Sequence, residues 1–99
     1  VRKDGITPLW MTCSMGHTDI VQFLLVREEI LVNQANAGGY TPLLIACRNG
    51  YVDVVQLLLA RKEIQISQTD EKGNTPLNVA QHFKHTKIVS LLKRYSAST

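Results

Sequence analysis

The side chains best suited to chemistry in this 99-residue sequence are two cysteines and three histidines. Cys13 and His17 lie four residues apart, a spacing that could pair a thiol nucleophile with its base. Gly16 breaks the segment between them, however, and no acidic residue is placed to orient the imidazole. His82 and His85 are three residues apart, but a zinc site needs a further ligand at suitable spacing and none follows. These residues therefore predict neither a nucleophile nor a metal site.

Other motifs that would indicate catalysis or cofactor binding are absent from the sequence. It has no glycine-rich dinucleotide motif, no phosphate-binding loop and no H-E-x-x-H zinc motif. We therefore expect no enzyme activity, no catalytic residues and no cofactor.

The cysteines instead point to an internal repeat, because Cys13 and Cys47 are separated by 34 residues. The tripeptide Thr-Pro-Leu recurs at the same interval, at residues 7–9, 41–43 and 75–77, and a glycine stands two positions before each copy. The second half of each unit repeats in phase as well, through Ile20-Val21, Val54-Val55 and Ile88-Val89 and through Leu24, Leu58 and Leu92. A period of this length indicates stacked supersecondary units.

The residue pattern of each unit predicts two short helices. Threonine followed by proline is a helix start, since Thr caps free N–H groups and Pro is tolerated at the first helical position. Gly16 and Gly50 suit the left-handed conformation that ends the first helix of units one and two. The recurring apolar residues then form one stripe along a second helix, with Asp19 and Asp53 in its first turn. Neither helix can bury its stripe alone, so neighbouring units must stack.

The same stacking argues against a bridge between Cys13 and Cys47. Packed helices lie roughly 8–10 Å apart, whereas a disulfide needs Cα atoms within about 4.4–6.8 Å of each other. We therefore expect two free thiols that act as small buried groups, as in proteins of a reducing compartment.

The repeating unit resembles the ankyrin repeat, whose pattern includes G-x-T-P-L followed by V-x-x-L-L. Both motifs recur in phase three times, and the resemblance covers residues 2–95. It implies an all-α solenoid of helix-turn-helix units joined by β-hairpin-like loops. We expect one domain over residues 1–99, with repeats at residues 2–35, 36–69 and 70–99.

The residue that follows Thr-Pro-Leu departs from the family pattern in all three units. The usual histidine is replaced by Trp10, Leu44 and Asn78. The resemblance therefore implies that the side-chain hydrogen bonds that usually link adjacent turns are missing.

The two ends of the repeat array differ in polarity. In unit three Lys84 replaces the glycine that ends the first helix, and Lys93 replaces an apolar residue, as in a terminal repeat whose outer face meets water. Unit one has no such adaptation, since its residues Trp10, Met11, Ile20 and Phe23 include large apolar groups. We therefore expect the chain to be a fragment of a longer array, with more repeats before residue 1.

Asn33 is a candidate for modification. Ankyrin repeats of the form L-x5-D-V-N can be hydroxylated on the asparagine by a 2-oxoglutarate-dependent hydroxylase, and the segment from Leu25 to Asn33 matches except that Leu31 replaces Asp. The interpretation that we prefer is that Asn33 braces its loop through local side-chain hydrogen bonds.

The resemblance implies a protein-protein interaction module that holds a partner on its hairpin tips and on the concave face of the first helices. Tyrosine and arginine on such a face are the residue types most enriched among binding hot spots. Carried over by register, the expected partner-binding residues are Lys3, Asp4, Ile6, Ser14, Met15, Ala37, Tyr40, Arg48, Asn49, Glu71, Lys72, Asn74, His82 and Phe83.

The uneven distribution of charge supports an alternative function. Residues 1–71 carry six Lys and Arg against eight Asp and Glu, whereas residues 72–99 carry five basic residues and no acid. This basic end could attract nucleic acid or another acidic surface. Stacking aromatic residues should then be interleaved with the basic ones, and only Phe83 and Tyr95 are near. We rank protein binding first and do not expect a nucleic-acid ligand.

The longest apolar run, from Leu43 to Cys47, is far shorter than the roughly 18 residues that span a bilayer. The sequence also shows no signal peptide. We expect a monomeric intracellular protein, cytoplasmic or nuclear, that does not insert into a membrane.

Overall fold

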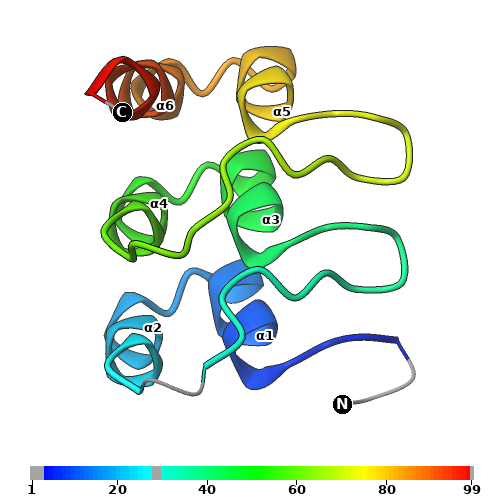
Figure 1. Cartoon of the computed structure of the whole chain (residues 1–99), viewed down its shortest axis with the longest axis vertical. Helices are drawn as coiled ribbons and strands as arrows, with labels where there is room; N and C mark the ends of the chain where they lie inside the picture. The colour runs from blue at the N-terminus through cyan, green and yellow to red at the C-terminus, as the bar shows by residue number, and fades with distance from the viewer. Residues whose placement is uncertain (1–3, 28–29, 99) are drawn as a thin grey trace.

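The computed structural model describes residues 4–27 and 30–98, and this part of the chain forms six α-helices and no β-strand (Figure 1). The helices are α1 (Pro8–Met15), α2 (Thr18–Leu25), α3 (Pro42–Asn49), α4 (Val52–Leu59), α5 (Pro76–His82) and α6 (Thr86–Ser98). Each unit contributes two helices, so the predicted all-α solenoid of helix-turn-helix units is confirmed.

The units stack so that their helices form two columns (Figure 1). The first helices, α1, α3 and α5, lie above one another, and so do the second helices, α2, α4 and α6. Each first helix also packs against the second helix of its own unit. The loops that precede the first helices extend away from the column of second helices and lie one above another (Figure 1).

The first helix of every unit begins where the sequence predicts. Thr7, Thr41 and Thr75 have extended backbone angles, and each hydroxyl accepts a hydrogen bond at 3.1 Å from the backbone N–H three residues later. Proline follows each threonine at the start of the helix, where its missing N–H has no helical partner to lose. These caps set the register between each loop and the helix that follows it.

The first helices end differently in unit three. Gly16 and Gly50 follow α1 and α3 with φ angles of 72° and 80°, in the left-handed region that glycine enters freely. Lys84 takes the equivalent position after α5 with a φ of 61°, although its Cβ disfavours this conformation. The glycine also serves packing in unit two, because a Cβ on Gly50 would lie 2.6 Å from the ring of His85.

One apolar core runs through all three units, and the two cysteines belong to it. Cys13 and Cys47 are completely buried and both are free thiols, as the helix spacing predicts. Burial raises the pKa of each thiol to about 12, since the thiolate would lose its hydration. Other members of the core are Leu9, Val21, Leu43, Val54, Leu58, Ile88 and Leu92.

Polar side chains shape the loops that precede α3 and α5. The Oδ1 atom of Asn36 accepts two hydrogen bonds from backbone N–H groups of its own loop. Asp70 occupies the same position one unit later, and its Oδ1 accepts from the N–H groups of Lys72 and Asn74, each at 2.9 Å. These donors, led by the N–H of Asn74, hold the pKa of the Asp70 carboxyl below its ordinary value. Each side chain therefore folds its loop into a compact turn.

Successive loops are joined by backbone hydrogen bonds. The N–H of Ala37 donates to the carbonyl of Asp4 at 2.7 Å, and the N–H of Glu71 donates to the carbonyl of Gly38 at 3.3 Å. This close approach requires glycine before the first two Thr-Pro pairs, because a Cβ would lie 2.7 Å from the carbonyl oxygen of Ala35 at Gly5 and 2.7 Å from the backbone nitrogen of Glu71 at Gly39. A Cβ on Gly73 would meet no atom within 4 Å. The predicted hairpin-like loops are thus stacked turns.

Trp10 restores one of the links that the family histidine provides. Its indole N–H donates to the carbonyl of Tyr40 at 2.8 Å and so connects α1 with the next loop. The prediction that these bonds are all missing is therefore wrong for unit one, because an indole carries an N–H donor just as an imidazole does. Leu44 is completely buried and joins the core instead, and the amide of Asn78 turns back to cap its own helix.

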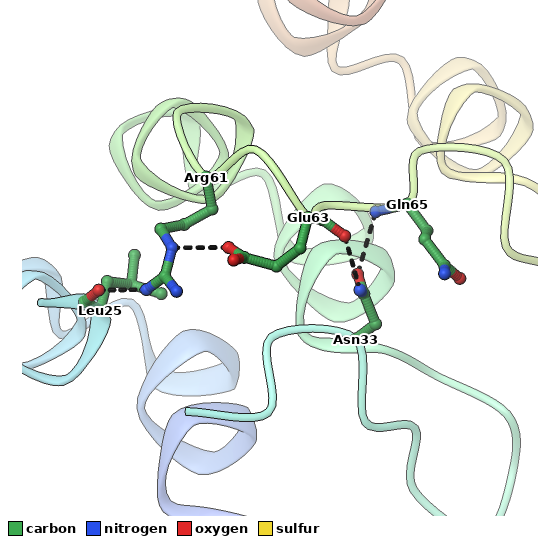
Figure 2. Close-up of polar contacts among 5 residues, drawn as sticks. All are labelled: Leu25, Asn33, Arg61, Glu63 and Gln65. Carbon is green, nitrogen blue, oxygen red and sulfur yellow. Dashed lines mark hydrogen bonds and ion pairs between the residues drawn. The ribbon is translucent and has the colours of Figure 1, made fainter. Parts of the chain in front are cut away.

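The loops that follow α2 and α4 are joined by a second set of polar contacts (Figure 2). Asn33 uses both ends of its amide, since Nδ2 donates to the carbonyl of Glu63 at 2.8 Å and Oδ1 accepts from the N–H of Gln65 at 3.0 Å. The predicted brace is therefore not local, because it spans two units. Arg61 donates to the carboxylate of Glu63 at 2.7 Å and to the carbonyl of Leu25. It thereby places a cation at the C-terminal end of α2, where the helix dipole favours one.

Candidate protein-binding surface

The loops before the first helices and the C-terminal ends of those helices carry the residues predicted to bind a partner. Lys3 lies outside the described residues. Because the units stack, the loop of each unit lies beside the loop of the next unit (Figure 1). The ends of the first helices lie beside one another in the same way (Figure 1). The loop positions are Asp4, Ile6, Ala37, Tyr40, Glu71, Lys72 and Asn74, and the positions at the helix ends are Ser14, Met15, Arg48, Asn49, His82 and Phe83.

Six of these residues line one open hollow between α3 and α5, which we call the α3–α5 groove. Two further residues of α5, Asn78 and Val79, complete its wall. The groove joins two loops to two helices, and so lies between units two and three. Its lining consists of Tyr40, Arg48, Lys72, Asn74, Asn78, Val79, His82 and Phe83.

The other predicted residues lie outside this groove, and several of them hold units together. Asn49 donates through Nδ2 to the carbonyl of Ser14 at 3.0 Å, and this bond links α3 to α1. Met15 is 53% exposed and gives the predicted binding face an apolar side chain in unit one. The predicted residues outside the groove are Asp4, Ile6, Ser14, Met15, Ala37, Asn49 and Glu71.

Arg48 lies near two aromatic rings of the α3–α5 groove. Its guanidinium carbon is 5.9 Å from the ring centroid of Tyr40 and 5.6 Å from that of Phe83. Both distances are within the range of a cation–π contact. Arg48 and Phe83 are exposed, whereas Tyr40 is half-buried and packs against the core. Side chains of units two and three therefore meet around one cation.

Two histidines surround Phe83. The ring of His82 meets it edge-on with 4.8 Å between centroids, and the ring of His85 lies nearly parallel to it at 6.3 Å. Nε2 of His85 also lies 3.0 Å from the carbonyl oxygen of Arg48, within hydrogen-bond distance. His85 therefore holds unit three on the end of α3. Its ring also lies next to Phe83, which lines the groove.

Comparison with known families decides the identity of the repeat. A family model of three ankyrin repeats matches residues 1–70, and a model of a single ankyrin repeat matches residues 72–99. The chain belongs to the ankyrin repeat family. No curated protein matches it. The α3–α5 groove accordingly lies between its second and third ankyrin repeats.

Asn78 and Val79 also lie at this surface of the ankyrin repeats, although they are not among the residues predicted from register. Asn78 lies four residues before His82, so the two side chains share one face of α5. That spacing is a signal from which Asn78 could be found. Val79 is only 6% exposed, and no pattern in the sequence marks it as part of a groove. Only the packing of the third ankyrin repeat on the second brings it there.

The groove contains cations, aromatic rings and amides, which are groups suited to recognition. Across residues 4–27 and 30–98, no three His, Cys, Asp or Glu side chains are placed to hold a metal ion together. Within the same residues, none of the helices has the length and apolar character needed to cross a membrane.

Proposed function

We propose that this ankyrin repeat domain holds another protein on its loops and on the ends of its first helices, and that it catalyses no reaction. Ankyrin repeats are generally protein-protein interaction modules, which supports the first part of the proposal. The observation that most supports this binding face is the α3–α5 groove, where six residues predicted from register alone come together.

The composition of the groove suits a binding hot spot. Hot spots are rich in tyrosine and arginine and lie near the centre of an interface. Tyr40 and Arg48 are such residues in the central repeat, and Phe83 adds exposed apolar surface beside them. The capped helices and linked loops hold these side chains in place before a partner arrives, which lowers the entropy lost on binding.

Substitution of Arg48 by alanine tests this face. The side chain is exposed, so Arg48→Ala should change the free energy of unfolding by no more than about 0.5 kcal/mol. It should weaken the binding of a protein captured by the immobilised domain by roughly 1–2 kcal/mol or more, as a central hot spot does. The measurement is a titration of that captured protein against the wild type and the variant.

Gln56→Ala is the matched control, because Gln56 is exposed on α4 and does not line the groove. This variant should bind the captured protein as the wild type does. Tyr40→Ala should also lose binding, but Tyr40 packs against the core, so its thermal melt must be recorded beside the titration. Loss of binding in Gln56→Ala but not in Arg48→Ala would place the partner on the second helices and contradict the proposal.

The alternative of a nucleic-acid surface on repeat three gains little support from the positions of its aromatic rings. Of the two aromatic residues near the basic ones, Tyr95 is half-buried and packs against the core. Phe83 is the exposed one, so the two do not form a continuous platform on which successive bases could stack. We also expect the protein to lie inside the cell, in the cytoplasm or nucleus, because free buried thiols suit a reducing compartment. We expect it to act there as a monomer.

A further inference from the structure

Among the residues that the structure describes, Arg48 has aromatic neighbours but forms no ion pair with an acidic one. Within the described residues, no hydrogen bond or ion pair engages its guanidinium, while the rings of Tyr40 and Phe83 lie 5.9 and 5.6 Å away. A guanidinium that stacks against aromatic rings keeps its in-plane N–H donors available. Those donors match the two oxygens of a carboxylate, which they bind through two parallel hydrogen bonds.

The lining of the α3–α5 groove does not neutralise this cation. Lys72 adds a second positive charge, and none of the lining residues is acidic. The carboxylate of Asp70 lies in the same loop as Lys72, but it is only 5% exposed and is occupied by donors of that loop. Glu71 is exposed in the loop and does not line the groove. The groove therefore favours an anionic ligand.

Apolar surface lies directly beside the cations. Phe83 is 45% exposed, and Val79 lies in the same wall of the groove. Tyr40 contributes a half-buried ring from the loop before α3. A ligand that combines a carboxylate with a neighbouring apolar side chain would satisfy both parts of this lining.

We propose that the α3–α5 groove binds an acidic peptide segment of the partner protein, with an Asp or Glu carboxylate on Arg48 and an adjacent apolar side chain against Phe83. This inference rests on the proposed function and adds the chemistry of the partner. A nucleic acid fits less well, because its binding requires a track of cations along many phosphates. Arg48 and Lys72 are the Lys and Arg residues of the groove lining, and two cations do not form such a track.

The test uses the full chain and two libraries of short fluorescent peptides that differ only at the central residue, Glu in one and Gln in the other. Fluorescence polarisation should show at least about tenfold tighter binding of the Glu library, because hydrogen bonds between charged groups are the strong ones. Arg48→Gln should abolish this preference, and Arg48→Lys should restore only part of it. Lys62→Gln removes an exposed charge outside the groove and should leave the preference unchanged.

Equal affinity for the two libraries, or binding of neither, would overturn the assignment of a carboxylate to Arg48. Tighter binding of a single-stranded oligonucleotide than of the Glu library, with the same dependence on Arg48, would also overturn it and assign the groove to nucleic acid. The proposed function has its own test in the captured protein. If that protein depends on Arg48 while the peptides show no preference, the binding face stands and only the carboxylate inference fails.

Discussion

Lys84 adopts the left-handed backbone conformation that glycine occupies at the equivalent positions of the other two repeats. Its Cβ makes this conformation unfavourable, and its side chain is exposed and not part of the apolar core, so no burial offsets the cost. Lys84→Gly should therefore raise the free energy of unfolding by about 1 kcal/mol. Urea denaturation followed by circular dichroism measures the change.

Lys84→Ala separates backbone strain from the effect of the positive charge. Alanine removes the charge but keeps the Cβ, so the free energy of unfolding of this variant should rise little or not at all. If it gains as much stability as the glycine variant, relief of strain at this position is not the reason.

At the scale of the helices, α2 and α6 carry isoleucine at the same register but in different surroundings. Ile88 on α6 is completely buried, because α6 packs on α4 of the preceding repeat, whereas Ile20 on α2 is 48% exposed. Ile88→Ala should therefore lower the free energy of unfolding by about 2–4 kcal/mol, as the loss of a core side chain does. Ile20→Ala should lower it by less than about 1 kcal/mol.

Both variants are to be measured by equilibrium denaturation under the same conditions. The two substitutions remove the same atoms, so any difference reports burial alone. Equal losses would mean that Ile20 is covered in solution and would contradict the exposure of α2.

At the scale of the whole molecule, the two faces at the ends of the stack differ in polarity. The face of repeat one exposes Met11, Ile20 and Phe23, whereas the equivalent Ile45 and Val54 of repeat two are buried. At the other end, Gln81 and Lys93 are exposed where repeats one and two carry cysteine and leucine. The apolar end face is therefore a surface on which a further repeat could stack.

Fusion of an extra repeat to either end tests this difference. A copy of residues 36–69 fused in register ahead of repeat one would cover the apolar face, and should raise the thermal midpoint by more than about 5 °C. The same copy fused in register after repeat three would meet polar side chains and should change the midpoint little. Differential scanning calorimetry measures the thermal midpoints of the two fusions. Equal increases in the midpoint at both ends would contradict the expected difference in polarity between the end faces.

The repeat, the two helices of each unit and the starts of the first helices can all be predicted from the sequence. Thr-Pro dipeptides cap helices through contacts within three residues, so their effect does not depend on the rest of the fold. The 34-residue period and the apolar stripes then required stacking. The burial of Cys13 and Cys47 as free thiols follows from the same argument, because it needs only the spacing of packed helices.

Contacts between residues of different repeats, by contrast, depend on how the repeats pack. The bond from Trp10 to Tyr40 and the brace from Asn33 to Glu63 join residues 30 positions apart, and no local pattern specifies them. Register predicts a binding face of fourteen residues, but six of them line one groove because of how repeat three packs on repeat two. The direction in which a side chain points between two repeats depends on the packing of both, and the sequence of either repeat taken alone does not contain that information.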